Sequence, residues 1–567
     1  MQLRSPALIE EFAAKGWWGT DTFKDVLERN AERAPDALAL VDPLNRAEVT
    51  DGPALRLTWG ELNDRVRRLA RALIRQGVAK DTIIAAQLPN TVELAELYLA
   101  ASHLGAIVSP LPWQYREHEL RMLIPQLAAS HVITAARIGH HQHAAMFAAL
   151  RPELPSVQSI LAYGDGLPEG VTGLDALLAE EYESDTLAAY AAATKVDAND
   201  LITICWTSGT EGRPKGVPRS YNDWWVPALG TIDGAELREG AVVLNPFPLT
   251  AMGGIGGMFC VWLQIGGTLV QHHPFSLPAF LRQIAAERVE FTVAPPVLLN
   301  MLLQNAALLE QADISSLKVI GSGAAPLSPW MVKAWQEQYG IPVINYFGSN
   351  EGITIVGSHR DIPNPETRAV LFPRFGAPDQ RWNNRVAGWM ETKLAAADGS
   401  PITEPGQPGE LCVRGPAVFA GYYNAPEITA RSFDADGFYR TGDVFELAAE
   451  GGEDRFYRFA GRLKDIIIRG GMNISAEEIE GLLQGHPAIA EVAIVGYPDA
   501  LMGERMCACV VPRPGQDVTL SDLVGYLRDQ QIASFKYPER LLLLETMPRN
   551  PMGKIIKQAL REQNAIP

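Results

Sequence analysis

The chain has few cysteines and no excess of positive charge. Five cysteines stand among 567 residues, and no second Cys or His pair completes a metal-ligand spacing with Cys507 and Cys509. Reduced structural thiols in a cytoplasmic protein are the favoured interpretation. Glu10, Glu11 and Lys15 interrupt the N-terminal stretch, so we expect no secretory signal peptide. The formal net charge of −17 disfavours nucleic acid as a partner, whereas an anionic small molecule needs only local positive charge.

Charged residues are absent from one long stretch. No Asp, Glu, Lys or Arg occurs in residues 241–281, which is long enough to cross a bilayer. However, Pro246, Pro248 and six glycines within residues 253–267 make a poor lipid-facing helix. We therefore predict a buried segment that lines a cavity. A membrane-inserted transporter is the alternative that this composition disfavours.

Helical and strand-like segments alternate along the first two thirds of the chain. Leu62, Val66, Leu69 and Leu73 recur at helical spacing, and a strand is predicted at residues 83–88. Strands separated by helices of this length imply parallel βαβ units. Further strands are predicted at residues 106–111, 201–206, 241–244, 267–271, 291–293, 317–320 and 343–346.

A helix start is predicted after the strand at residues 83–88. Asn90 has the side chain of an N-cap residue, and Glu93 follows at the reciprocal position three residues on. This spacing matches a capping box. We therefore expect Asn90 to cap the helix that follows.

The length and a change of composition predict several domains. A chain of 567 residues is too long for one hydrophobic core. After about Pro373, glycine, proline and short strand-like runs dominate, which predicts a β-rich subdomain. The last hundred residues have the pattern of a compact α/β unit.

A loop built for phosphate follows the strand at residues 201–206. The sequence TSGTEGRPKG, residues 207–216, combines hydroxyls, glycines and two cations, Arg213 and Lys215. Backbone N–H groups of a glycine-rich turn can hold phosphate oxygens, so we predict a polyphosphate site rather than a solvated surface turn. It is not a Walker A loop because Gly216 follows the lysine, and a strand–GxGxxG–helix fingerprint is also missing.

Five motifs in order resemble those of the adenylate-forming superfamily, which contains acyl-CoA synthetases, carrier-protein-loading adenylation domains and beetle luciferases. The likeness in architecture covers nearly the whole chain. The motifs are TSGTEGRPKG at 207–216, NYFGSNEG at 345–352, YRTGDVF at 439–445, GRLKDIIIRGGMNISAEEIE at 461–480 and PRNPMGKIIK at 548–557.

The resemblance implies a fold and a reaction. The expected fold class is α/β, with an N-terminal adenylation domain of βαβ-type parallel sheets at residues 1–463. Its β-rich subdomain covers about residues 373–463, and a small mobile α+β domain follows at 464–567. A carboxylic acid would react with ATP to give an acyl-adenylate and pyrophosphate, and coenzyme A would then displace AMP. Expected cofactors are ATP, Mg²⁺ and coenzyme A.

The resemblance also implies individual roles. Asp443 would accept hydrogen bonds from both ribose hydroxyls, and Phe347 would pack on adenine. Glu351 and Thr207 would bind Mg²⁺, and Glu351 and Asn350 are expected catalytic residues. The full set of expected ATP-binding residues is Thr207, Ser208, Gly209, Thr210, Lys215, Gly323, Ala324, Ala325, Tyr346, Phe347, Gly348, Asp443, Phe456 and Arg462.

Two lysines of the C-terminal region carry the sharpest implied roles. Lys554 would bridge carboxylate and α-phosphate during adenylation, as a compact point charge that stabilises the developing anion. Lys464 would be the hinge about which the C-terminal domain rotates. The rotation would replace Lys554 by a loop that flanks the coenzyme A tunnel, formed by Arg469, Gly470, Gly471 and Met472.

The acyl pocket is expected to be apolar. Ala251 stands where the family often has His or an aromatic residue, and Asn350 replaces the usual Thr before the magnesium carboxylate. The absence of charge favours an apolar acid, and the chain resembles bacterial synthetases for medium-chain or alicyclic acids such as cyclohexanecarboxylate, with aryl acids still open. The expected walls are Trp225, Ala251, Met252, Gly254, Gly321 and Ile353.

Two rival functions share most of these features. A free-standing adenylation enzyme that loads a carrier protein would share every motif. A non-catalytic nucleotide sensor is disfavoured because all the implied catalytic and nucleotide-binding charges are retained. We expect a small-molecule acid, ATP and coenzyme A as partners and no nucleic acid. We also expect no membrane span, and a homodimer is possible.

Overall fold

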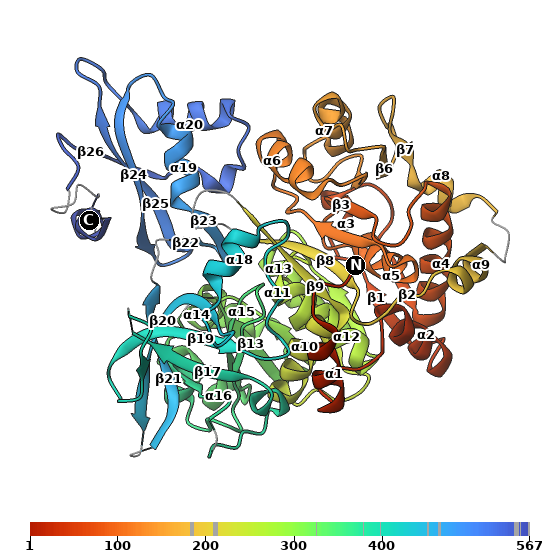
Figure 1. Ribbon diagram of the computed structural model, residues 1–567, viewed down its shortest axis with the longest axis horizontal. Helices are drawn as coiled ribbons and strands as arrows, with labels where there is room; N and C mark the ends of the chain where they lie inside the picture. The colour runs from red at the N-terminus through yellow and green to blue at the C-terminus, as the bar shows by residue number, and fades with distance from the viewer. Residues whose placement is uncertain are drawn as a thin grey trace.

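Within the described residues, the computed structural model has four β-sheets, three formed by strands within residues 38–462 and one by strands within residues 466–543 (Figure 1). The C-terminal region lies to one side of the rest. Helix α21 (Lys557–Asn564), the last described helix, is on the outer side of that region. The structure describes residues 1–181, 186–207, 214–324, 326–377, 379–396, 398–450, 453–462, 466–548, 555 and 557–564.

Two large sheets are mainly parallel, and helices cover them. In the first, only the β8–β9 pair is antiparallel. Its strands, in spatial order, are β7 (Thr172–Gly173), β6 (Ser159–Tyr163), β5 (His131–Ala135), β3 (Ile83–Ala86), β4 (Ile107–Pro110), β8 (Leu201–Thr207) and β9 (Lys215–Ser220).

The second large sheet has antiparallel pairs only at its two ends. Its order is β15 (Thr354–Gly357), β14 (Val343–Gly348), β13 (Val319–Gly323), β12 (Phe291–Val293), β10 (Val242–Asn245), β11 (Thr268–Gln271), β1 (Leu38–Val41) and β2 (Arg56–Thr58). The α/β fold class with parallel sheets is therefore confirmed.

The remaining two sheets are smaller. An antiparallel sheet is formed by β16 (Leu371–Pro373), β21 (Glu453–Arg462), β20 (Tyr439–Glu450), β19 (Pro408–Arg414), β17 (Glu391–Ala395) and β18 (Pro401–Ile402). The C-terminal sheet contains β23 (Met472–Ser475), β22 (Ile466–Arg469), β25 (Gly503–Pro512), β24 (Ile489–Asp499) and β26 (Arg540–Leu543). The domain boundaries at 463 and 464 stay a prediction.

The helices follow the expected apolar spacing. The predicted stripe of Leu62, Val66, Leu69 and Leu73 is fully buried on α4. The α-helices are α1 (Pro6–Ala14), α2 (Phe23–Arg33), α3 (Arg46–Val49), α4 (Trp59–Arg75), α5 (Val92–Leu104), α6 (Glu117–Leu127), α7 (His143–Leu150), α8 (Leu174–Ala179), α9 (Thr186–Ala193), α10 (Tyr221–Ala235), α11 (Met252–Gly254), α12 (Cys260–Ile265), α13 (Leu277–Glu287), α14 (Pro296–Gln304), α15 (Ala306–Glu310), α16 (Pro329–Tyr339), α17 (Pro365–Val370), α18 (Pro426–Ser432), α19 (Ala476–Leu483), α20 (Leu520–Asp529) and α21 (Lys557–Asn564).

The charge-free stretch at residues 241–281 is part of the core, as predicted. Phe259, Trp262 and their neighbours on α12 are buried between α2, α4 and α10. The indole of Trp262 stacks on that of Trp59 with ring centroids 5.0 Å apart. Among the described helices, none has the length and apolarity to cross a membrane.

One helix start differs from the prediction. Helix α5 begins at Val92 after Thr91, and Asn90 does not cap it. The amide of Asn90 instead donates to the carbonyl of Phe247 and accepts from the N–H of Leu249. Glu93 is used elsewhere, in a buried ion pair with Arg46. The sequence spacing was compatible with a cap, but partners more than 150 residues away are not visible to local spacing.

Cys507 and Cys509 share one face of β25, as their spacing predicts. Both are buried thiols, and they pack with Leu560 of α21. The thiols therefore belong to the core of the C-terminal region.

Candidate active site

The predicted phosphate loop is the connection of a β-hairpin. Strand β9 runs antiparallel to β8, so that Thr207 stands opposite Lys215. Residues 208–213 between them lie outside the described part of the chain. The hairpin starts at the carboxyl end of a strand in a parallel sheet, which is where ligands bind in such folds. The pairing brings the first hydroxyl and the lysine of the motif together.

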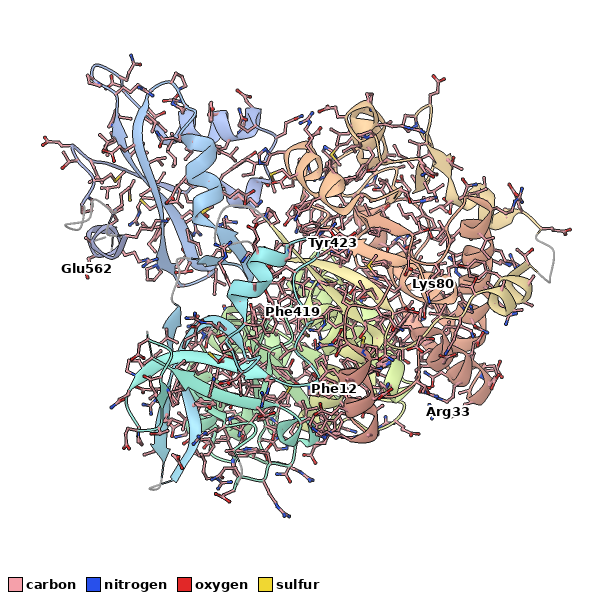
Figure 2. All side chains as sticks on the ribbon, viewed as in Figure 1. Phe12, Arg33, Lys80, Phe419, Tyr423 and Glu562 are labelled. Atoms are coloured by element: carbon pink, nitrogen blue, oxygen red, sulfur yellow. The ribbon has the colours of Figure 1, made fainter. Side chains whose placement is uncertain are left out.

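Lys215 and Glu351 belong to one buried cluster. Glu351 is 7% exposed and accepts a hydrogen bond of 3.0 Å from the hydroxyl of Tyr422. The ammonium of Lys215 lies over the ring of the same tyrosine, 4.8 Å from its centroid. Figure 2 labels Phe419 and Tyr423, on either side of Tyr422, at the centre of the molecule. Tyr422 was not singled out from the sequence, although it stands in the glycine- and proline-rich part that follows Pro373.

Asn350 connects the phosphate hairpin to the predicted acyl pocket. Its side-chain oxygen accepts a 2.7 Å hydrogen bond from the N–H of Met252. Its side-chain amide donates to the carbonyl of Trp206 at 3.2 Å. In this arrangement the Asn350 side chain fixes two backbone segments relative to each other, immediately before Glu351, the carboxylate predicted to bind Mg²⁺.

A buried arginine supports the turn that carries Asn350 and Glu351. Arg219 on β9 is fully buried and donates to the carbonyls of Asn350 and Ala417, at 3.1 and 2.9 Å. Gly352 has a φ of +100°, and a Cβ there would lie 1.8 Å from the Ala417 carbonyl oxygen. Only glycine fits this close approach, so the glycine after Glu351 has a steric role in the site.

The predicted ribose carboxylate lies close to the same cluster. Asp443 is 9% exposed, and its N–H donates to the hydroxyl of Thr441. The register of β20 and β21 places Arg462 opposite Asp443. Tyr439, whose hydroxyl is 3.1 Å from that of Tyr422, has its pKa raised by burial first and then by Glu351. The phosphate, metal and ribose motifs therefore meet at one place.

Phe347, which is expected to pack on adenine, lies edge-on against Phe445, with ring centroids 4.8 Å apart. A further ring, Phe459, lies 6.2 Å from Phe347. Phe456 instead packs against Trp382 in a separate small cluster. Residues 456–459 pair regularly with residues 445–448, so Phe456 and Phe459 lie on opposite faces of β21, and Phe459 is the ring beside Phe347.

Three further predicted ATP-binding residues, Gly323, Ala324 and Gly348, lie on or next to strands β13 and β14. Gly323 on β13 lies so close to β14 that a Cβ there would be 2.3 Å from the Tyr346 carbonyl oxygen. Ala324 follows it with a φ of +65°, and Gly348 ends β14. The close approach of two strands accounts for the glycine at position 323.

The expected acyl-pocket residues fall into two groups. Met252 and Gly254 form α11, directly after Ala251. Gly321 lies under the ring of Tyr346, where a Cβ would be 2.5 Å from Cε2. Trp225 and Ile353 are buried in the hydrophobic core. The indole N–H of Trp225 donates to the carbonyl of Asp21, and Ile353 packs beside the β-rich sheet.

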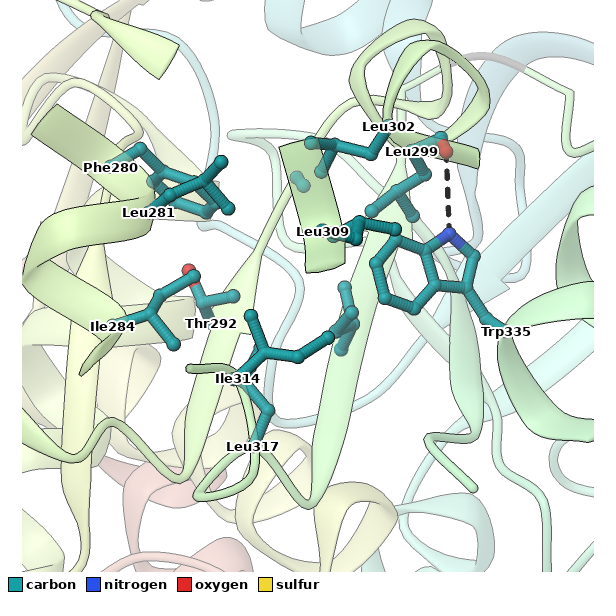
Figure 3. A pocket seen from close by; sticks show the side chains of 12 residues that line it. Phe280, Leu281, Ile284, Thr292, Leu299, Leu302, Leu309, Ile314, Leu317 and Trp335 are labelled. Carbon is teal, nitrogen blue, oxygen red and sulfur yellow. Dashed lines mark hydrogen bonds between the residues drawn. The ribbon is translucent and has the colours of Figure 1, made fainter. Parts of the chain in front are cut away.

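A separate apolar cavity lies beneath the second large sheet (Figure 3). It is enclosed by side chains of α13, α14 and α16, and the indole N–H of Trp335 donates to the carbonyl of Leu299 at its edge. None of the residues that line it belongs to the expected site. We assign this cavity to core packing.

In the C-terminal region, the expected coenzyme A loop is a tight hairpin. Arg469 on β22 pairs with Met472 on β23, and Gly470 and Gly471 between them have φ values of +55° and +80°. Two successive left-handed residues are typical of a type I′ turn, which glycine adopts without strain. Arg469 is fixed by Glu539 at 2.6 Å.

Several predicted residues cannot be placed. Ser208, Gly209, Thr210, Ala325, Lys464 and Lys554 lie outside the described residues. Within the described ranges, no three His, Cys, Asp or Glu side chains come together as a metal site. A single carboxylate such as Glu351 still fits Mg²⁺, which is commonly held by one or two carboxylates together with substrate phosphates.

Comparison with known proteins identifies the family. The AMP-binding enzyme family matches residues 27–423, and the AMP-binding enzyme C-terminal domain matches residues 478–554. The chain belongs to this family of adenylate-forming enzymes. The predicted superfamily and the class of AMP-forming acid–CoA ligase are confirmed, and enzymes of this class use ATP, Mg²⁺ and coenzyme A.

Individual relatives and a solved structure agree with this assignment. The chain is 30% identical to a medium-chain fatty-acid–CoA ligase of Escherichia coli K12, over 97% of this chain and 92% of the relative. It is 31% identical to a salicylyl-CoA synthase / salicylate adenylyltransferase of Streptomyces, over 98% and 95%. The amide bond synthetase McbA of Marinactinospora thermotolerans superimposes with a TM-score of 0.77 at 26% identity, over 95% and 99%.

Proposed function

We propose that this enzyme activates a compact, apolar carboxylic acid with ATP and transfers the acyl group to coenzyme A. The observation that carries the proposal is the pair of hydrogen bonds of Asn350. They join the end of the phosphate strand to the start of α11, next to Glu351. Reacting carboxylate and triphosphate would thereby be held against each other, which is the main task in phosphoryl transfer.

The reaction would proceed in two steps, adenylation and thioester formation. In the first, a carboxylate oxygen forms a bond to the α-phosphorus of ATP, and the bond from that phosphorus to the bridging oxygen breaks to release pyrophosphate. In the second, the sulfur of coenzyme A attacks the acyl carbon, AMP leaves with the electrons of the carbon–oxygen bond, and the thiol proton passes to solvent. Lys215 and Lys554 would neutralise phosphate charge in the first step. Bound Mg²⁺ would add positive charge at the phosphates.

The proposed acid is of medium size. The segment from Ala251 to Gly254 carries no charge. The ring of Tyr346 covers Gly321 and occupies the space that the missing side chain of this glycine leaves. This arrangement favours medium-chain or alicyclic acids over long chains. The similarity to the medium-chain ligase points in the same direction, and the similarity to the salicylate enzyme keeps aryl acids as the next class to test.

A pyrophosphate-release screen tests the proposal. We expect release with medium-chain and alicyclic acids, and formation of the acyl-CoA only when coenzyme A is present. The rival function, loading of a carrier protein, predicts pyrophosphate release without any acyl-CoA. Failure of every acid in the presence of ATP and Mg²⁺ would contradict the proposed function.

Lys554→Ala tests the role of the C-terminal lysine. We expect loss of acyl-adenylate formation, while thioester formation from supplied acyl-adenylate continues. Lys557→Ala is a matched control, because Lys557 pairs with Glu480 at 2.8 Å on α19. Equal loss of both half-reactions in Lys554→Ala would remove the proposed role.

We infer a cytoplasmic location for the enzyme. Its five cysteines are all buried thiols outside disulfides, which supports a location in the reducing cytoplasm. The choice between monomer and homodimer stays a prediction that size-exclusion chromatography with light scattering decides.

A further inference from the structure

A buried lysine joins the C-terminal region to the N-terminal part of the molecule. Lys536 is 4% exposed and follows α20 in a short 3-10 turn. Its ammonium donates to both carboxylate oxygens of Glu478 on α19, at 2.8 and 3.0 Å. It also donates to Glu119 on α6, at 3.4 Å. One cation is therefore shared by carboxylates of two separate parts of the chain, which we call the Glu119–Lys536–Glu478 cluster.

Glu119 makes two further hydrogen bonds that define its place. One of its oxygens accepts from the N–H of Ala533, at 3.0 Å, across the same boundary. The other accepts from the N–H of Arg116, at 2.9 Å, and caps the start of α6. The Glu119 side chain is only 1% exposed. The ring of Tyr115 covers the cluster, with its centroid 5.2 Å from the Lys536 ammonium.

The contact between Lys536 and Glu119 can break while Lys536 keeps Glu478 as a partner. Burial lowers the pKa of Lys536, but Glu478, Tyr115 and Glu119 together raise it above its usual value. The lysine is thus an ammonium ion. Lys536 and Glu478 belong to the same region and would move together, whereas Glu119 would be left behind without that cation. Loss of a buried partner is costly for the group that remains.

The cluster is also close to the predicted coenzyme A loop. Arg469 donates to the carbonyl of Phe535, the residue next to Lys536, and to Glu539. Helix α21 lies on the outer side of the region (Figure 1). In this arrangement the Gly470–Gly471 turn, rather than α21, is connected to the boundary with the N-terminal part.

We propose that Glu119 is a positioning residue that holds the C-terminal region, through Lys536 and the Ala533 N–H, in the orientation used for thioester formation. The inference rests on the proposed two-step function, because it assigns the described orientation to the second step. Glu119 does not touch the reacting atoms. Its contribution is the population of one domain orientation, so its loss should slow one half-reaction and spare the other.

Glu119→Gln is the variant of choice. Glutamine can still accept at the start of α6, as in other capping boxes, so the helix should form. We expect thioester formation from supplied acyl-adenylate to fall about 10-fold, the size expected when a hydrogen bond to a buried charge is lost. Adenylation, measured as pyrophosphate release, should change less than about two-fold. Glu117→Gln removes a charge from the same turn of α6 and serves as the matched control.

A distance measurement supplies a readout that does not depend on activity. Trp330 and Leu501 are 51% and 59% exposed, one on each side of the boundary, and the native cysteines are buried. Spin labels on Trp330→Cys and Leu501→Cys should give one dominant distance in the parent protein. The distribution should broaden when Glu119→Gln is added and stay unchanged with Glu117→Gln.

The outcomes separate the two proposals. An unchanged distance distribution in Glu119→Gln, or an equal loss of both half-reactions, overturns the role of Glu119. Broadening together with selective loss of thioester formation supports it. If the parent protein forms no acyl-adenylate with any acid, the proposed function fails and so does the assignment of the orientation to a step, while the label distances still decide whether Glu119 holds the domains together.

Discussion

Two buried cations show how differently the two regions of this molecule are held. Arg219, beside the candidate active site, donates to the backbone carbonyls of Asn350, Ala417 and Asp223. All its acceptors are neutral, and all belong to the part of the chain before the C-terminal region. Lys536, at the boundary, donates only to carboxylates among its described partners, and they come from both regions.

The difference indicates which contact can open. Burial is the main cause that lowers the pKa of Arg219, whereas carboxylates outweigh burial and raise the pKa of Lys536. Several short bonds to fixed backbone make the Arg219 site a static support. The Lys536 cation keeps one carboxylate when the boundary opens, which makes the second contact reversible. The candidate ATP site is thus rigid, and the contact proposed to position the C-terminal region is exchangeable.

The largest effect is expected for Arg219→Met, which tests the static half of the comparison. The substitution leaves buried carbonyls without a donor, and each costs about 1–3 kcal/mol. We expect the free energy of unfolding to fall by about 3–5 kcal/mol and adenylation to be lost, because the turn that carries Asn350 and Glu351 is released. Urea unfolding and pyrophosphate release measure the two effects.

Arg385→Met is the control for that substitution. Arg385 pairs with Asp233 at 2.7 Å, but its side chain is 52% exposed. Its removal should cost less than about 1 kcal/mol, as is usual for exposed ion pairs. A loss of stability as large as that of Arg219→Met would show that burial of the cation is not what distinguishes the active-site arginine.

Tyr422→Phe should have an intermediate effect, confined to the rigid half. The variant keeps the ring under Lys215 but removes the hydroxyl that donates to Glu351 at 3.0 Å. A hydrogen bond to a charged group contributes about 1.5–3 kcal/mol, so we expect adenylation to fall about 10-fold or more and its Mg²⁺ dependence to shift. Calorimetry of Mg²⁺–nucleotide binding should show the same shift without turnover.

Tyr423→Phe provides the matched control, one residue along the same loop. Thioester formation from supplied acyl-adenylate should be unaffected in both variants, because the hydroxyl acts on the magnesium-site carboxylate. If Tyr422→Phe slowed that half-reaction as much as adenylation, the tyrosine would support the whole site and not Glu351 in particular.

Local patterns in the sequence predicted the sheets and the buried stripe of α4 because burial has a period that the sequence carries. The resemblance of the motifs implied that Lys215, Glu351 and Asp443 meet, although they stand at the start of β9, after β14 and within β20, in three different sheets. The strand and stripe predictions depend on residues close together in the chain. They required no knowledge of which distant segment provides a given partner.

Long-range hydrogen bonds explain what the sequence could not predict. Asn90 has the spacing of a cap but bonds to residues 247 and 249. Phe459 lies outside the five motifs, and its contact with Phe347 joins strands of two different sheets. Neither Tyr422 nor Glu119 belongs to a motif that we recognised, and the importance of each depends on a partner from a distant part of the chain.

The smallest effect is expected for Arg121→Ala, at the exposed rim of the exchangeable contact. Arg121 donates to the side chain of Gln531 at 2.8 Å, across the same boundary that Glu119 closes. Its side chain is 40% exposed and is also paired with Glu153. Exposed pairs contribute about 0.2–1 kcal/mol, so thioester formation should fall less than about five-fold.

The rim variant therefore decides whether the boundary has one dominant contact. With the same supplied acyl-adenylate, Glu119→Gln should slow thioester formation clearly more than Arg121→Ala does. The reason is that water replaces the lost partner at the rim but cannot do so around a side chain that is 1% exposed. Equal effects of the two substitutions would mean that the docking energy is spread over the whole boundary, and the contrast between a rigid site and a single exchangeable ion contact would no longer hold.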